Sequence, residues 1–182
     1  YKRFAPLASM LNLDEADDID KQWAEVAARM NISADELKQK ILPMTALYSV
    51  AEHSRALLFA ITDGGLPSNV GGYYNLRVIF RRAMEFIDKF EWEVSLAEVC
   101  EWHADYLKPI YPELAKHLGE VKKILEVEKQ KYYHSKRKGK LVVEHLLKAK
   151  KQVTPDKLVE LYDSHGISPE QVREEAQKLN IH

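Results

Sequence analysis

The feature that most constrains the fold is a series of helix-start signals. A serine followed three residues later by Glu or Gln has the spacing of a capping box, and this spacing occurs at Ser33–Glu36, Ser95–Glu98 and Ser168–Gln171. Thr154 and Ser168 also stand directly before prolines, which suit the first position of a helix. No segment shows the alternation of β-branched and polar residues that is typical of a strand. The sequence therefore predicts an all-α protein with no sizeable sheet.

Apolar residues recur at helical spacing along most of the chain. The predicted helices span roughly 14–30, 33–42, 45–62, 74–90, 95–107, 111–134, 139–150, 155–164 and 169–179. The 74–90 segment has apolar residues on more than one side, which predicts a central helix. A weak seam near 91–95 predicts two packed helical subdomains, at 1–92 and 93–182.

The overall charge excludes no partner and favours none. The 182 residues include 27 Lys and Arg against 28 Asp and Glu, so any case for nucleic acid must come from local clusters. The single cysteine, Cys100, excludes an intramolecular disulfide and fits a reducing cytosol. No apolar run approaches the roughly 20 residues that span a bilayer, so no membrane partner is expected. Because the chain begins at Tyr1 and not at methionine, we expect a piece of a longer protein.

Basic residues are concentrated in residues 121–151, here named the basic block, which hold eleven Lys and Arg against three Glu. One interpretation is a solvated helix pair joined by a basic turn at 135–139, which makes a basic hairpin. The other is a patch that contacts a nucleic-acid backbone, with Tyr132, Tyr133 and His134 available for stacking. Composition alone does not separate the two.

The stretch ITDGGLPSNVGGYYNLRVIFRR, residues 61–82, combines glycine pairs with Pro67, Ser68 and Asn69, and we name this connection the PSN loop. No strand precedes it and no Gly-Lys-Ser/Thr follows, so it is neither a dinucleotide fingerprint nor a Walker loop. A plain connection between two helices is one interpretation. The other is RNA recognition, since an amide suits a base edge and arginines suit phosphates.

The run HSRALLFAITDGGLPSNVGGYYNLRVIFRRA, residues 53–83, resembles the signature of alanyl-tRNA synthetase in its archaeal form. LYSVAEHSR (47–55), YPEL (111–114), VKKILEVEKQKYY (121–133) and LYDSHGISPEQV (161–172) resemble neighbouring segments of that family. The resemblance covers nearly the whole chain. The PSN loop and the LYDSHG segment, when they occur together in this order, are specific for that family. The first lies in the expected 1–92 subdomain and the second in the expected 93–182 subdomain.

The resemblance implies the central tRNA-recognition region of an ATP-dependent class II ligase, between its aminoacylation and editing domains. That region reads a G·U wobble pair in the acceptor stem of alanine tRNA. By motif, the base-pair-reading residues fall on Asn69 and Asp163. The residues expected to hold phosphates are Arg77, Arg81, Arg82, Lys136, Arg137 and Lys138.

Further expectations follow from the same resemblance. ATP and Mg²⁺ belong to the catalytic domain and zinc to the editing domain, so neither a cofactor nor a catalytic residue is expected in this piece. Its partners are the alanine tRNA acceptor stem and the other domains of the same cytoplasmic synthetase. The competing interpretation is a helical protein–protein interaction module without RNA specificity.

Elementary chemistry supports the two base-reading residues. A G·U pair leaves the guanine 2-amino group unpaired in the readable minor groove of RNA, and either a carboxylate or an amide oxygen accepts its proton. Asp163 lies near a helix C-terminus, where the helix dipole disfavours an anion, and such misfits are more expected at functional positions. One departure concerns Tyr73, which stands where the family usually has glycine and would be strained if that position requires a positive φ.

Other candidates have a weaker basis. Cys100 and His103 form a C-x-x-H pair, but no second pair with ligand spacing follows, so packing is the expected role. His53 and Asp63 lie at opposite ends of one predicted helix, too far apart for an acid–base pair. Three tryptophans are expected to be core anchors: Trp23, Trp92 and Trp102. Asp156 and His165 are near Asp163 in sequence, but nothing singles them out.

Overall fold

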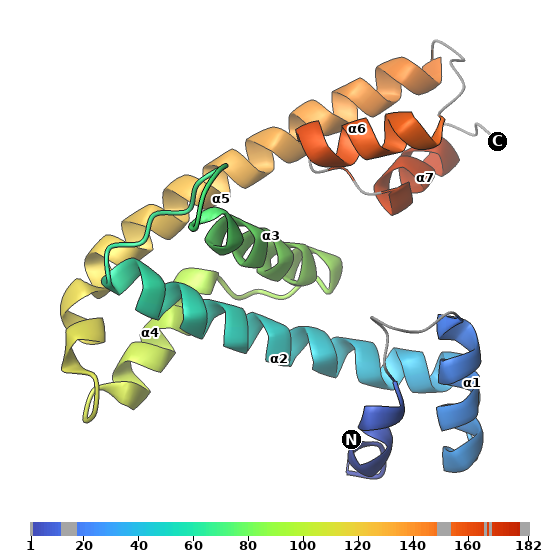
Figure 1. Ribbon diagram of the computed structural model, residues 1–182, viewed down its shortest axis with the longest axis horizontal. Coiled ribbons are helices and arrows are strands. Elements are labelled where there is room, and N and C mark those ends of the chain that lie inside the picture. The colour runs from blue at the N-terminus through green and yellow to red at the C-terminus, as the bar shows by residue number, and fades with distance from the viewer. Residues whose placement is uncertain (1, 12–17, 149–153, 166, 168, 179–182) are drawn as a thin grey trace. The chain divides into compact units, whose positions relative to one another are not determined.

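The computed structural model describes residues 2–11, 18–148, 154–165, 167 and 169–178. Every regular element among them is a helix, which confirms the predicted all-α class (Figure 1). The order is η1 (Ala5–Met10), α1 (Ile19–Met30), α2 (Ala34–Thr62), α3 (Tyr74–Lys89), α4 (Leu96–Leu107), α5 (Pro112–Lys148), α6 (Pro155–His165) and α7 (Pro169–Lys178). The short 3-10 helix η1 was not predicted, because it has no side-chain cap.

Helices begin where polar side chains cap them. The Ser33 hydroxyl accepts the Glu36 amide at 3.1 Å before α2. Before α4, both halves of the capping box form: the Glu98 amide donates to the Ser95 hydroxyl, and the Glu98 carboxylate accepts the Ser95 amide at 2.8 Å. Since each cap satisfies a backbone donor that the helix itself leaves unpaired, these starts are readable from sequence. The third predicted cap, Ser168, lies outside the described residues.

Helix α2 is continuous where two helices, 33–42 and 45–62, were predicted. Pro43 lies inside it. A proline in a helix interior removes one backbone hydrogen bond and costs about 3 kcal/mol. Buried residues stand on both sides of the proline, with Ile41 before it and Ala46 after it. Packing of the whole helix therefore offsets the local penalty, and the predicted break is wrong.

The central helix of its unit is α2, against which α1, α3 and α4 all pack. The prediction that 74–90 is central is wrong. Only one face of α3 is buried, and that face consists of Phe80, Ala83, Met84 and Ile87. Val78 of the same helix is 39% exposed, so the other face of α3 is available to solvent.

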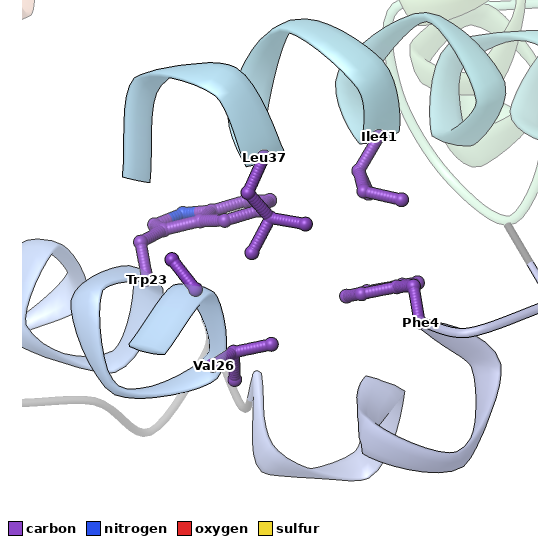
Figure 2. Packing of buried hydrophobic residues seen from close by; sticks show 6 residues of the cluster. Phe4, Trp23, Val26, Leu37 and Ile41 are labelled. Carbon is purple, nitrogen blue, oxygen red and sulfur yellow. The ribbon is translucent and has the colours of Figure 1, made fainter. Parts of the chain in front are cut away.

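One end of α2 is held by a compact apolar cluster. Figure 2 shows Trp23 and Val26 of α1, Leu37 and Ile41 of α2 and Phe4 of the N-terminal segment pointing toward one another. All five are at most 6% exposed. Full burial of such side chains contributes roughly 1.5–3 kcal/mol each, which fixes α1 and the N-terminal segment on α2.

Helix α5 runs without interruption from Pro112 to Lys148. The predicted turn at 135–139, and with it the basic hairpin, is wrong. Gly139 is helical and buried, and a glycine in a helix interior costs only about 1 kcal/mol relative to alanine. Tyr132 before it and Val143 after it are both buried, so packing on each side keeps the helix intact.

The chain divides into two compact units, residues 1–118 and 119–182. This division differs from the expected one at 92/93, because α4 packs against α2 and belongs with the first unit. The second unit has its own core, in which Val143 and Leu147 of α5, Leu161 of α6 and Val172 of α7 pack with Ile167, which lies between α6 and α7. Within the described ranges, no helix combines the length and the apolar character needed to cross a membrane.

Candidate nucleic-acid interface

The PSN loop connects α2 to α3, and two glycines make its first turn possible. Gly64 follows the helix with φ +90°, a conformation that residues with a side chain rarely adopt. Gly65 is buried, and its amide donates to the Ala60 carbonyl at 2.8 Å. A Cβ at Gly65 would lie 2.8 Å from the Ala60 carbonyl oxygen and 3.0 Å from the Tyr73 ring. The turn therefore needs glycine at one position for its dihedral angle and at the other for space.

The second half of the PSN loop, from Ser68 to Tyr73, is held together by internal hydrogen bonds before α3 begins. The Ser68 amide donates to the Tyr73 carbonyl at 3.3 Å, and the Ser68 hydroxyl donates to the Val70 carbonyl at 2.5 Å. Gly71 supplies the second positive φ, at +74°. Tyr73 has φ −91°, so tyrosine is accommodated without the strain that a left-handed backbone would impose.

Arg77, in the first turn of α3, reaches back across the PSN loop. One terminal nitrogen, Nη1, donates to the Asn69 side-chain oxygen, and the other, Nη2, donates to the Pro67 carbonyl at 3.1 Å. Arg77 is half-buried, as expected for a side chain that packs under a loop. The sequence predicted a phosphate contact for Arg77, and in the structure its guanidinium contacts Asn69 and Pro67 of the loop.

Asn69 is exposed near the tip of the loop, beside Val70, which is 78% exposed. Its amide oxygen accepts from Arg77, and its NH₂ group donates to none of the described residues. Pro67, two residues earlier, is buried. The loop is thus held in place at Pro67 and exposes a polar side chain at Asn69. This is the arrangement needed to offer a side chain to a partner.

Arg81 and Arg82 follow on α3, Arg81 half-buried and Arg82 exposed. Arg82 acts electrostatically on His53 of α2. Burial, and after it the Arg82 charge, lowers the pKa of His53, while Glu52 raises it. His53 Nε2 is buried and has no hydrogen-bond partner among the described residues. Asp63 lies at the C-terminal cap of the same helix, about 15 Å away at 1.5 Å per residue, so the structure does not bring these two groups together.

Cys100 and His103 of α4 both face backbone carbonyls of α2. Cys100 Sγ donates to the Ser54 carbonyl at 3.4 Å, and His103 Nε2 lies 2.9 Å from the Ala51 carbonyl. In the described part of the chain, no three His, Cys, Asp or Glu side chains gather as a metal site would require. The two residues therefore join α4 to α2.

Residues 121–148 of the basic block lie on α5, and the three central cations, Lys136, Arg137 and Lys138, are exposed. Successive residues of an α-helix point about 100° apart, so the three spread around the helix and do not form one face. Lys136 Nζ lies 5.6 Å from the centroid of the Tyr132 ring, a cation–π distance. Since Tyr132 is only 5% exposed, it is a packing residue and not an available stacking platform.

Asp163 belongs to the last turn of α6 in the second unit. Its side chain lies outside the described residues. Asp156 is in the first turn of α6, and His165 ends that helix. The two expected base readers are therefore on different units, Asn69 on the first and Asp163 on the second.

The tryptophans differ in their surroundings. Trp23 is a core residue at 4% exposed, and Trp92 stacks on Phe90 with ring centroids 5.2 Å apart. Trp102 is 59% exposed, so its prediction as a core anchor is wrong. It lies four residues before Tyr106, which is 84% exposed, and neither residue belongs to the buried face of α4.

Comparison with known proteins agrees with the resemblance noted in the sequence. Residues 8–182 match the model of the family described as tRNA synthetases class II (A). The alanine–tRNA ligase of Methanocella arvoryzae is 44% identical over 174 residues, which cover 96% of this chain and 20% of that ligase. The corresponding ligase of Nitrosopumilus maritimus is 37% identical over 173 residues, 95% of this chain and 19% of the relative. The chain spans about a fifth of the length of these relatives.

Proposed function

This chain belongs to the class II alanyl-tRNA synthetase family, and from that membership we propose that it is the tRNA-recognition part of an alanine–tRNA ligase. Its task in the full-length enzyme is to read the G·U wobble pair in the acceptor stem of alanine tRNA. The ATP-dependent joining of alanine to tRNA belongs to the catalytic domain, with its ATP and Mg²⁺. Zinc belongs to the editing domain, and the cytoplasm is the site of action.

The observation that carries this proposal is the anchored, polar-tipped PSN loop. Asn69 is exposed at its tip, and Arg77 ties it to the start of α3. A carboxamide both donates and accepts, so it matches the mixed edge of a base pair better than a phosphate. Arg81 and Arg82, one turn further along α3, are assigned to phosphates beside that pair.

The second unit supplies a contact of its own. We assign to Asp163 the acceptance of a hydrogen bond from the unpaired guanine 2-amino group, which a carboxylate suits because it only accepts. Lys136, Arg137 and Lys138 of α5 are assigned to the RNA backbone. Because these cations surround the helix, a single RNA strand contacts a subset of them, and their contribution is mainly sequence-independent affinity.

The test is binding of the 182-residue chain to acceptor-stem hairpins that carry either G·U or G·C at the third position. We expect a preference for G·U of about 1–3 kcal/mol, the usual contribution of one good base contact. Asn69→Ala and Asp163→Asn should each reduce that preference. Equal binding to both hairpins would refute base-pair reading by this region. No binding even at low salt would favour a protein–protein interaction module.

A further inference from the structure

We propose that Arg77 is the positioning residue of the PSN loop: it fixes the carboxamide of Asn69 so that the loop presents the NH₂ group to RNA. The inference rests on the proposed function and goes further, because it names a second specificity-determining residue. It also states which end of the Asn69 side chain meets the ligand.

The geometry is that of a clamp. The two terminal nitrogens of one guanidinium hold two different acceptors, the Asn69 side-chain oxygen and the Pro67 carbonyl. Pro67 is buried and Asn69 is exposed, so the clamp joins the fixed part of the loop to its exposed tip. Arg77 itself is held in the first turn of α3, three residues before the buried Phe80.

The chemistry of the pair fixes the orientation of the amide. An arginine has five N–H donors and no acceptor, so only the oxygen of Asn69 makes a favourable contact with it. The oxygen thus faces Arg77, and the two N–H bonds of the NH₂ group remain for a partner, since they donate to none of the described residues. Without Arg77, the terminal amide torsion has a broad, roughly two-fold preference, and both ends of the group become available.

A loop that presents donors selects ligand acceptors, namely base carbonyl oxygens or ring nitrogens. This differs from the sequence-based expectation that the Asn69 oxygen accepts the guanine 2-amino proton. A site built around a fixed donor discriminates strongly, because a ligand that places its own N–H there leaves two donors facing each other. In this arrangement the acceptor role falls to Asp163 alone.

The clamp requires an arginine. Lysine has the same charge but ends in a compact ammonium, so it does not hold two separated acceptors with one planar group. Arg77→Lys therefore separates charge from geometry. If Arg77 acted on RNA phosphates only, lysine would replace it with little loss.

The experiment uses the 182-residue chain and compares Arg77→Lys with Arg55→Lys. Arg55 is an exposed arginine of α2 that pairs with Glu52 at 2.5 Å, so it is a matched control outside the loop. Two quantities are measured: the ratio of G·U to G·C hairpin affinities, and the NMR resonances of the Asn69 side-chain NH₂ group without RNA. Asn69→Asp assigns those resonances by removing them, while its carboxylate still accepts from Arg77.

We expect Arg77→Lys to lower the G·U to G·C affinity ratio by roughly tenfold, close to the effect of Asn69→Asp. It should also shift the Asn69 NH₂ resonances, whereas Arg55→Lys changes neither quantity. In the Asn69→Asp background, Arg77→Lys should cause no further loss of the ratio, because both residues act through one contact.

Two results would overturn the inference. One is an unchanged affinity ratio in Arg77→Lys, whether or not the resonances move. The other is a loss that adds fully to that of Asn69→Asp, which would mean an independent RNA contact by Arg77. A wild-type chain that shows no G·U preference, with NH₂ resonances that still move in Arg77→Lys, would refute the proposed function while the clamp between the two side chains stands.

Discussion

The PSN loop and the basic block place polar side chains by opposite means. The loop holds one carboxamide through glycine turns, backbone hydrogen bonds and the Arg77 clamp. Residues 121–148 of the basic block lie on an uninterrupted helix, where Lys136, Arg137 and Lys138 are exposed and point in directions about 100° apart. From this difference we propose that the loop contributes specificity for RNA and the helix contributes salt-dependent affinity.

The largest expected effect comes from removing the support beneath the loop. Phe80→Ala truncates a side chain of α3 that is 1% exposed, so we expect the unfolding free energy of the first unit to fall by about 3–5 kcal/mol. Urea unfolding followed by circular dichroism measures this loss. Val78→Ala, at an exposed position of the same helix, is the matched control and should change stability little. A loss for Phe80→Ala as small as that of the control would mean that the loop does not depend on this packing.

The next largest effect is expected from filling the space beside Gly65, at the first turn of the loop. Gly65→Ala places a methyl group 2.8 Å from the Ala60 carbonyl oxygen, a backbone atom that cannot move aside cheaply. We expect a destabilisation of about 1–3 kcal/mol, as is typical of overpacking, together with a weaker G·U preference. Gly72→Ala is the control, because a methyl group there meets nothing within 4 Å and the φ is not positive. Equal melting temperatures for the two variants would contradict the close approach.

A smaller effect is expected from the basic block. It should change the affinity for RNA without changing the preference for G·U. Arg137→Gln removes one exposed cation of α5 and should weaken binding of G·U and G·C hairpins by the same factor. If Arg137 contacts a phosphate, the slope of log affinity against log salt becomes shallower by about 1. Lys157→Gln serves as control, since Lys157 already pairs with Glu160 at 2.7 Å on α6. A selective loss of G·U binding in Arg137→Gln would break the proposed division between specificity and affinity.

The smallest expected effect is a pH dependence at the helices that flank the loop. Burial and the Arg82 charge lower the pKa of His53 below its ordinary value of 6.5. The unfolded chain therefore binds this proton more readily than the folded one, so stability present above the unfolded pKa is lost as the pH falls below it. Unfolding free energies of wild type at about pH 7.5 and pH 5.5 should differ more than those of His53→Gln. Identical pH profiles would show that His53 does not contribute.

Much of the candidate site was predictable because its signals are local. The glycines, Pro67 and Asn69 mark a turn with a polar tip, and the arginines that follow on α3 are visible as charges. The partner of Arg77 was not predictable, because it lies across the loop, eight residues back at Asn69 and ten residues back at Pro67. No periodic pattern relates those positions. The sequence signal for such a clamp is an arginine in the first helical turn after a glycine-rich loop, from where it can reach back to the loop.

The sequence by itself determined the all-α class, the starts of α2 and α4 and the position of the PSN loop. Each of these depends on contacts within about four residues, such as the Ser33 and Ser95 caps, so the local chain contains the whole cause. Only the tertiary structure decided that α2 continues through Pro43, that α5 continues through Gly139, and that Trp102 is exposed. The physical reason is that a helix-breaking residue costs up to about 3 kcal/mol locally. Packing against residues distant in sequence buries apolar side chains, and the free energy of that burial decides whether the local cost is offset.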